Sequence, residues 1–300
     1  MTISIQSSGP NIGVIMKVAF LGAGLMGAGM IRRMLKNGHA VRVWNRSPEK
    51  VRALEAEGAV ACGEAAAAVE GAEQIHVMLS DDAAVDEVLE SIRKVIPGRT
   101  WIIDHTTTAP TPTAERAARW AARGHVYLHA PVFMSPKNTE EGTGFMLVSG
   151  DPDKIAAVMP ELEQMASKVI RLGDRPETAA AYKLFGNLML IGIQGVIADV
   201  VRLAHAAGVN PSDAVELFTQ FNPGETLPVR AARIAGGPYE PASFAVSMAR
   251  KDVRLMIEEA ARHGVELGLM PLIADLYDQA IARGEGSLDT TAAFRYPHET

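Results

Sequence analysis

A single charged residue interrupts the apolar stretch AAAYKLFGNLMLIGI, which covers residues 179–193. Lys183 is the only formal charge in this stretch, and Asn187 is its other strongly polar side chain. Burial of an ammonium group without a partner is costly and lowers its pKa. A lysine in this setting therefore either extends its charge to water or has a chemical role.

The spacing of the polar residues around Lys183 fits one face of a helix. At about 100° per residue, Lys183, Asn187 and Gln194 lie on one narrow stripe, with the first two residues one turn apart. If this face lines a cleft, Lys183 can donate to a carbonyl oxygen that becomes an alkoxide as a hydride arrives. Alternatively, Lys183 extends to solvent and Asn187 is an ordinary polar helix residue. The spacing alone leaves both interpretations open.

A glycine-rich motif follows the first strand-like run of the chain. Gly22, Gly24 and Gly27 have the spacing G-x-G-x-x-G between the apolar run KVAFLG and a helical pattern. Such glycines permit a tight turn and the close approach of a pyrophosphate, to which the helix N-terminus offers N–H donors. We predict that a dinucleotide binds at Gly22, Gly24, Leu25, Met26 and Gly27; a purely structural glycine turn is the alternative.

The end of the second predicted strand distinguishes the two dinucleotides. NAD sites commonly have Asp or Glu about 20 residues after the glycines, where it accepts hydrogen bonds from the ribose hydroxyls. This chain has Asn45 there, followed by Arg46 and Ser47, with Lys50 nearby. Asn45 does not repel a 2′-phosphate and Arg46 can bind one, so we expect NADP(H) to be preferred over NAD(H). Alternatively, Arg46 is a solvated surface residue and Ser47 caps a helix, and both roles can hold for Ser47.

The elements that must position these residues alternate between strand and helix patterns. Strand-like runs cover 17–22, 41–45, 74–79, 100–104, 126–132 and 144–150. Helix-like stretches such as 65–68, 81–94 and 113–124 separate them, and after about residue 174 the segments 177–207, 211–221, 245–264 and 270–283 all have helical patterns. This order predicts an α/β Rossmann-type doubly wound domain followed by an all-α domain. We expect an N-terminal extension at 1–15, an NADP-binding domain at 16–174 and an α-helical domain at 175–300.

Composition excludes several function classes. The 300 residues are 48% hydrophobic and 21% charged, and the net charge of −6 argues against nucleic acid or an anionic membrane as the main partner. Cys62 is the only cysteine and no cluster has metal-ligand spacing, so we expect a cytoplasmic protein without a structural metal. The first 15 residues lack the features of a signal peptide. The longest apolar stretch, 184–198, is shorter than the roughly 20 residues of a membrane span, so no membrane association is expected.

Several motifs occur together in a fixed order along the chain. They are FLGAGLMGAGM, GH-x-V-x-V-x-NR, VMLSDDAAV, DHTTTAP, HAPV, the Lys183-x-x-x-Asn187 helix and KDVRLM at 251–256. In this order and combination, the chain resembles the β-hydroxyacid dehydrogenase family from residue 16 to about 283. That family includes 3-hydroxyisobutyrate dehydrogenases and glyoxylate/succinic semialdehyde reductases. The resemblance implies a Rossmann domain, a long interdomain helix and an α-helical domain, commonly assembled as a homodimer or homotetramer.

The resemblance also implies roles for individual residues. Lys183 matches the catalytic lysine of the family and Asn187 its helical partner. The backbone at Met78 and Leu79 would pass under the cofactor, and Thr107 would lie near the nicotinamide ribose. In the α-helical domain, the positions that would close over cofactor and substrate are Phe244, Lys251 and Asp252. Without the resemblance, Phe244 would be interpreted as a core aromatic and the other two as a solvated helix pair.

Three departures from the family pattern concern the substrate. The family motif APVSGG, whose serine hydroxyl and glycine amides hold a carboxylate, reads APVFMS here, with Phe133, Met134 and Ser135 at the substrate-binding positions. The glycine-rich segment before the catalytic lysine is replaced by RPET at 175–178, and Gly186 stands where the family often has Asn. We therefore expect weak activity on small carboxylate-bearing aldehydes and a preference for a longer or more apolar carbonyl compound.

These observations predict an NADP-dependent oxidoreductase that transfers hydride between the nicotinamide and a small aldehyde or 3-hydroxy acid. Lys183 would be the proton donor or acceptor. Imine reductases share the architecture but generally lack the lysine, so reduction of a C=N bond is the first alternative. A non-catalytic NADP-binding protein is the second, and we expect such a protein to lose the lysine first.

Overall fold

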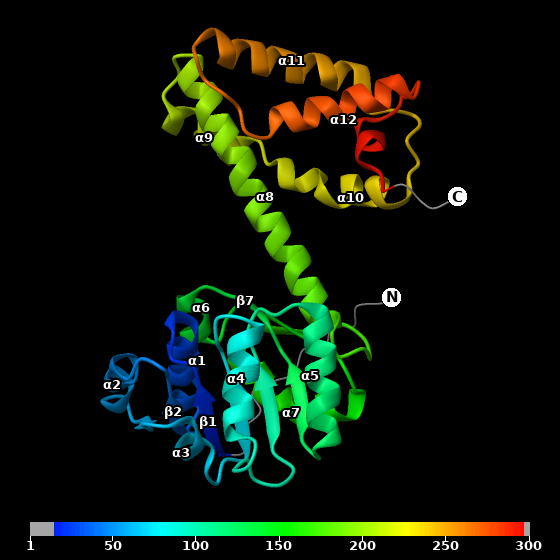
Figure 1. Ribbon diagram of the computed structural model, residues 1–300. Coiled ribbons are helices and arrows are strands. Elements are labelled where there is room, and N and C mark those ends of the chain that lie inside the picture. The colour runs from blue at the N-terminus through cyan, green and yellow to red at the C-terminus, as the bar shows by residue number, and fades with distance from the viewer. Residues whose placement is uncertain (1–14, 297–300) are drawn as a thin grey trace. The chain divides into compact units, whose positions relative to one another are not determined.

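The structure is a computed structural model that describes residues 15–296 (Figure 1). The chain divides into two compact units, Met1–Asn187 and Leu188–Thr300, and each is described by itself. The predicted N-terminal extension lies outside the described residues except for Ile15. The predicted domain boundary at residue 174 precedes the division between the units, because helix α8 (Thr178–Ala206) begins in the first unit and ends in the second.

The first unit is built on a six-stranded parallel sheet with the order β3-β2-β1-β4-β5-β6. The strands are β1 (Lys17–Leu21), β2 (Ala40–Trp44), β3 (Val60–Ala61), β4 (Gln74–Val77), β5 (Trp101–Asp104) and β6 (Val126–His129). Each pair of neighbouring strands in this sheet runs parallel. The order reverses between β1 and β4, and in such sheets ligands bind beyond the carboxyl ends of the strands at this point.

Helices cover both faces of this sheet (Figure 1). Along β1, Val18 and Phe20 pack against one set of helices, whereas Ala19 and Leu21 pack against the other. The first face carries α1 (Leu25–Lys36), α2 (Glu49–Glu55) and α7 (Pro152–Met165), and the second carries α3 (Ala65–Val69), α4 (Asp82–Ile92) and α5 (Pro110–Ala122). Because successive side chains of a strand point to opposite faces, each face of the sheet has its own hydrophobic core. The predicted Rossmann-type domain is confirmed.

A second, three-stranded sheet corrects the strand expected at 126–132. That run ends at His129 and resumes as β7 (Val132–Phe133), which pairs antiparallel with β8 (Phe145–Val148); β8 pairs parallel with β9 (Lys168–Arg171). The expectation of one continuous strand is wrong because Pro131 lacks the N–H that a ladder requires. Its carbonyl accepts a hydrogen bond from the Leu147 amide at 2.9 Å.

The second unit consists of helices, as predicted. In addition to the end of α8, it contains α9 (Pro211–Gln220), η1 (Pro223–Thr226), α10 (Leu227–Gly236), α11 (Val246–Arg262), α12 (Met270–Ala282) and η2 (Thr290–Phe294). Val246, Val253 and Tyr277 belong to the core between α11 and α12. Asp289 stabilises the loops around this core, since it accepts hydrogen bonds from Arg233, from Ser243 and from the backbone of η2.

Helix α8 agrees with the helix expected at 177–207 but is longer than the apolar stretch 184–198 within it. It has 29 residues, and its most apolar window has a mean hydropathy of 1.8, so by length and composition alone it could cross a membrane. The argument from the shorter stretch 184–198 is therefore wrong about length. Near the start of the helix the Lys183 side chain is itself buried, and farther along Asp199 accepts hydrogen bonds from the amides of Gly268 and Leu269. The absence of a membrane partner stays a prediction.

Candidate active site

Gly22 and Gly24 lie between β1 and α1, and Gly27 lies in the first turn of α1; each glycine has its own geometric reason. Gly22 has φ +113°, and a Cβ there would stand 2.1 Å from the Met78 carbonyl oxygen. A Cβ at Gly27 would stand 2.0 Å from the Gly22 carbonyl oxygen. Around Gly24, by contrast, no side chain or distant backbone atom of residues 15–296 lies within 4 Å of the position of a Cβ. Two glycines thus allow close packing, and the third leaves an open approach to the backbone.

The N-terminus of α1 is free to bind an anion. Gly24 is its N-cap residue, no side chain caps the helix, and its first turn has no acidic residue. The first N–H groups of a helix have no partner within the helix and attract anions. Leu25 is 81% exposed and Met26 is partly buried. The open space at Gly24 and the uncapped helix start together fit a dinucleotide pyrophosphate.

Asn45 ties the end of β2 to the glycine turn. Its Oδ1 accepts a hydrogen bond from the Ala23 amide at 2.9 Å, and its Nδ2 donates to the Ser47 carbonyl at 2.9 Å. Ser47 does not cap α2, since the N-cap position belongs to Pro48 and no side chain caps that helix. Asn45 therefore fixes the turn that carries Arg46.

Arg46 is exposed beyond the carboxyl end of β2. Hydrogen bonds, first of all from the Ala84 amide, lower the pKa of the Asp81 carboxyl at the start of α4, and the positive charge of Arg46 contributes to this shift. The guanidinium thus lies on the side of the sheet where the glycine turn also lies. Its position is compatible with a 2′-phosphate site, and its selectivity stays a prediction.

The loops after β4 and β5 meet beside the glycine turn. The Met78 amide donates to the Leu21 carbonyl, and the Leu79 amide donates to Oγ1 of Thr106 at 3.0 Å. Thr107, the predicted residue, is exposed, whereas Thr106 is buried and holds the neighbouring loop. Sequence reasoning missed Thr106 because DHTTTAP contains three successive threonines, and only the structure shows which hydroxyl is turned inward.

A buried polar network supports these loops. Asp104 accepts hydrogen bonds from the Thr106 amide at 2.8 Å and from the Tyr127 hydroxyl at 2.5 Å. Burial, together with the Asp104 carboxylate, raises the pKa of Tyr127. Arg116 is fully buried, with Nε 2.8 Å from Asp86, and its NH1 donates to the Tyr127 hydroxyl. This network fixes the end of β5. The sequence did not indicate it, because Arg116 and Asp86 lie in helix-like stretches whose pattern does not show which charged side chains are buried.

Lys183 is buried in the structure, with 9% of its surface exposed. Its Nζ lies over the face of the Phe133 ring, 4.1 Å from the ring centroid. Within residues 15–296, its ammonium has no ion pair or hydrogen bond to the protein. Burial lowers its pKa below the ordinary lysine value. The structure therefore contradicts the solvent-exposed alternative for Lys183.

The start of α8 is attached to the small sheet by a buried serine. Ser149 Oγ accepts a hydrogen bond from the Ala179 amide at 2.8 Å and donates to the Pro176 carbonyl at 3.1 Å. Lys183 lies one turn beyond Ala179, so this attachment also locates the ammonium. Asn187 is partly buried and, in the described part of the chain, forms no hydrogen bond with Lys183. Its orienting role stays a prediction.

The predicted substrate residues have different environments. Phe133 contacts Lys183, as described, whereas Met134 packs against the core of the first unit. Ser135 is the N-cap of α6 (Pro136–Glu141): its hydroxyl accepts from the Asn138 amide and donates to the Asn138 side chain at 2.7 Å. These bonds already occupy the Ser135 hydroxyl, and anion recognition by this residue stays a prediction.

The remaining predicted residues belong to the second unit. Phe244 precedes α11 and is 41% exposed. On α11, the Lys251 ammonium lies 2.9 Å from the Asp252 carboxylate, and both side chains are largely exposed. Their roles over cofactor and substrate stay predictions.

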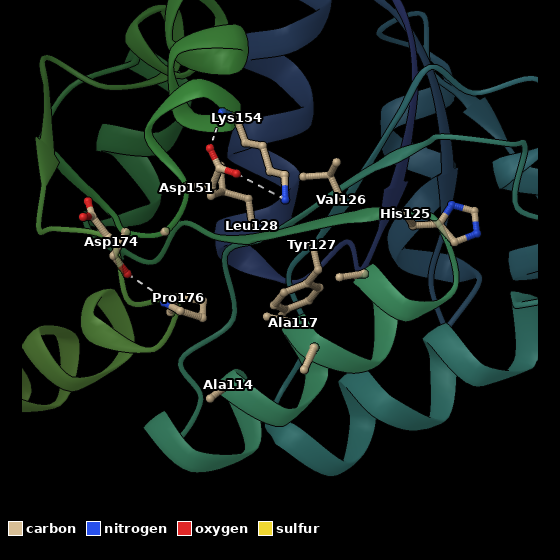
Figure 2. Close-up of a pocket in the computed structure, with 14 residues that line it drawn as sticks. Ala114, Ala117, His125, Val126, Tyr127, Leu128, Asp151, Lys154, Asp174 and Pro176 are labelled. Atoms are coloured by element: carbon tan, nitrogen blue, oxygen red, sulfur yellow. Dashed lines mark hydrogen bonds and ion pairs between the residues drawn. The ribbon is translucent and has the colours of Figure 1, made fainter.

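A separate groove lies beside the edge strand β6. It has a volume of about 300 Å³, and Figure 2 shows Ala114 and Ala117 of α5 on its wall, with Lys154 and Asp151 near each other. The Lys154 ammonium is 3.5 Å from the Asp151 carboxylate. None of the predicted site residues lines this groove. We therefore place the candidate active site at the glycine turn and Lys183.

Comparison with known families agrees with this geometry. A profile described as the NAD binding domain of 6-phosphogluconate dehydrogenase matches residues 17–173. A second profile, described as NAD-binding of NADP-dependent 3-hydroxyisobutyrate dehydrogenase, matches residues 178–296. The chain belongs to the β-hydroxyacid dehydrogenase family. It is an NAD(P)-dependent oxidoreductase of the β-hydroxyacid dehydrogenase type.

Individual relatives within and around this family are similar over nearly the whole chain. The 3-sulfolactaldehyde reductase of Escherichia coli is 29% identical over 280 residues, covering 92% of this chain and 93% of that protein. The 3-hydroxyisobutyrate dehydrogenase of Pseudomonas aeruginosa is 29% identical, covering 90% and 94%. Among solved structures, an imine reductase from Pseudomonas sp. has a TM-score of 0.85 at 25% identity, covering 94% of this β-hydroxyacid dehydrogenase and 99% of that chain.

Proposed function

We propose that this β-hydroxyacid dehydrogenase interconverts a small aldehyde and its hydroxy acid or alcohol with NADP(H), and that Lys183 exchanges the proton. The observation that carries this proposal is the buried Lys183 ammonium, which has no acceptor among residues 15–296 and a lowered pKa. A structural lysine would be expected to have an acceptor or to reach water. The uncapped helix start at Gly24 supports the cofactor part of the proposal.

In the proposed reaction, the cofactor and Lys183 have separate roles. The bound nicotinamide would supply or accept the hydride. In the reductive direction, Lys183 donates a proton to the carbonyl oxygen as negative charge develops there. Its lowered pKa brings the ammonium closer to the working pH, which makes it a better acid than an exposed lysine. Because no protein group accepts from it in the described residues, all of its N–H donors are available to substrate or water.

The preference for NADP(H) rests on Asn45 and Arg46. Asn45 provides two neutral hydrogen bonds to the surrounding backbone, so no carboxylate faces a 2′-phosphate at this position. Arg46 supplies an exposed guanidinium, and charge-assisted hydrogen bonds to phosphate are among the strong ones. The description of the second family profile as NADP-dependent is in keeping with this preference.

Reduction of an imine is the second candidate. It is favoured by the similarity to the imine reductase from Pseudomonas sp. and by the apolar ring of Phe133 beside Lys183. Imines are reduced most readily as iminium cations, and a second positive charge next to Lys183 would be repelled. We therefore place carbonyl reduction first.

We also propose that the working enzyme is a homodimer or a larger homo-oligomer. The exposed apolar residues of α8 include Phe185 at 62%, Leu188 at 72% and Ile191 at 66%, an unusual exposure for side chains of this size. An apolar groove of about 490 Å³ in the second unit, partly lined by Leu217 and Phe218, offers a surface of matching chemistry on another copy. A cytoplasmic location without a nucleic-acid partner remains a prediction from composition.

A substrate panel tests the proposed reaction. NADPH consumption would be measured with glyoxylate, succinic semialdehyde, methylmalonate semialdehyde, bulkier apolar aldehydes and cyclic imines, each also with NADH. We expect the highest kcat/KM with an apolar aldehyde and NADPH, and weak activity on glyoxylate. A kcat/KM above about 10⁴ M⁻¹s⁻¹ on glyoxylate would show that a small carboxylate is well bound. A cyclic imine as the best substrate would replace the proposal by the second candidate.

A further inference from the structure

Helix α8 contains a glycine where its contacts require one. A Cβ at Gly186 would stand 2.3 Å from Cζ of Phe133 and 2.6 Å from Cε1 of the same ring. Contacts this short do not occur, so any other residue at this position would displace the ring. Glycine weakens a helix interior because it loses more conformational freedom on folding than other residues. Its presence here is explained by the space that the Phe133 ring occupies.

The ring is held firmly on its other sides. Phe133 belongs to β7 and lies opposite Phe145 of β8. It also packs against a small apolar cluster formed by Leu147, Leu172 and Ala179. Ala179 is the residue whose amide is bound by Ser149, so the same contacts fix both the ring and the start of α8.

We propose that Phe133 and Gly186 form a matched pair that positions the Lys183 ammonium for proton transfer. Gly186 leaves the space for the ring, and the face of the ring carries the Nζ atom 4.1 Å from its centroid. The catalytic consequence rests on the function proposed above. Phe133 and Gly186 are positioning residues in this scheme, and Lys183 is the group that meets the substrate.

The chemistry of the ring suits this task. An aromatic face attracts a cation without accepting a directed hydrogen bond in the way that a carboxylate does. A carboxylate in the same place would also hold the proton on Lys183 and raise its pKa. The ring excludes water instead, and burial is the one cause of the lowered pKa of Lys183. Phe133 thus locates the ammonium, desolvates it and leaves its N–H donors free.

Gly186→Ala is the central variant. Alanine favours a helix more than glycine does, and the atoms in its way are the far end of one side chain, so the variant should fold. We expect the displaced ring to admit water to Lys183, kcat to fall at least about tenfold and the KM for NADPH to change less than about twofold. Gly192→Ala is the matched control in the same helix, because the described part of the chain places no neighbouring atom within 4 Å of its Cβ position. It should leave kcat and KM unchanged.

A double-mutant cycle tests whether Gly186 acts through the ring. Phe133→Leu keeps an apolar side chain but removes the aromatic face, and it should lower kcat by itself. If the pair is coupled, Gly186→Ala should have no further effect on kcat in the Phe133→Leu background. Equal fold-changes in both backgrounds would overturn the proposal.

A direct titration separates this proposal from the proposed function. The pKa of Lys183 would be followed by NMR in protein labelled at the lysine side chains, with Lys183→Met for assignment. We expect the pKa to rise by at least about half a unit in Gly186→Ala, where water reaches the ammonium, and to stay constant in Gly192→Ala. An unchanged pKa in Gly186→Ala would overturn the pairing. Normal turnover of Lys183→Met would overturn the proposed function, whatever the titration shows.

Discussion

Lys183→Met is the substitution that best separates a catalytic lysine from a structural one. Methionine keeps the apolar stem and approximate length of the side chain but removes the charge. The change forfeits one cation–π contact with Phe133, worth about 0.5–2 kcal/mol. It also removes the cost of a buried ammonium, about 1.4 kcal/mol for each unit by which burial lowers the pKa. These terms have opposite signs, so any destabilisation should stay below the roughly 2 kcal/mol that the strongest cation–π contact is worth.

Turnover should respond very differently from stability. Loss of a general acid slows a reaction by about 100-fold to 10,000-fold, and we expect kcat of Lys183→Met to fall by at least about 100-fold with little change in NADPH binding. In the wild type, kcat/KM for carbonyl reduction should fall as pH rises through the pKa of Lys183, since the protonated form is the donor. This decline should lie below the ordinary lysine value of 10.5, because burial lowers the pKa.

Both quantities can be measured on the same preparation. Urea unfolding gives the free energy of unfolding, initial rates of NADPH consumption give kcat, and quenching of protein fluorescence gives the NADPH dissociation constant. Destabilisation by more than about 2 kcal/mol would identify Lys183 as a structural residue, since that exceeds the largest contact it forfeits. Retention of near-normal turnover would refute its role as proton donor.

Three further predictions concern cofactor, pH and assembly. Arg46→Ala should raise the KM for NADPH at least about tenfold in steady-state assays, because a charge-assisted hydrogen bond is worth about 1.5–3 kcal/mol, and equal effects on NADPH and NADH would refute the 2′-phosphate assignment. Burial, with His76 beside it, lowers the pKa of His105 from 6.5 to about 3. The folded state therefore binds fewer protons below pH 6.5, and the free energy of unfolding should fall by up to about 1.4 kcal/mol per pH unit on acidification; urea titrations of His105→Gln should show a shallower slope. Leu188→Glu should shift the protein toward a monomer in light scattering, and an unchanged mass would show that this face of α8 is not an interface.

The fold was largely predictable from the sequence because its signals are local. Alternating strand and helix patterns identified the parallel sheet. The ends of β1, β2, β4 and β5 lie within two residues of their predicted positions. β8 was also predicted, within 144–150, whereas β3, β7 and β9 were not predicted as separate strands. These short strands are held by pairing with other segments, such as Phe133 with Phe145, and little in their own sequence specifies the pairing.

The site was predictable where a motif has a local backbone requirement and less so where it depends on long-range contacts. Gly22 and Gly27 are recognised from spacing because the local backbone leaves no room for a side chain at either position. Phe133 and Gly186 were each noticed as departures from a family pattern, but their mutual contact is invisible in a sequence that separates them by more than fifty residues. Ser149 gave no signal at all, since one buried hydroxyl in a strand end looks like any other serine.

If the chain prefers NADP(H) as proposed, the two hydrogen bonds of the Asn45 side chain limit how it could change to NAD(H). Exchange of Asn45 for Asp is the obvious first step toward NAD, because Asp would accept from the ribose hydroxyls. One carboxylate oxygen could still accept from the Ala23 amide, but the other would face the Ser47 carbonyl at the 2.9 Å distance that Nδ2 now spans. Two acceptors at that distance repel, so the turn would have to open before any ribose could bind. A change of cofactor is therefore more accessible through Arg46, whose side chain supports no part of the turn, than through the position that sequence comparison would choose.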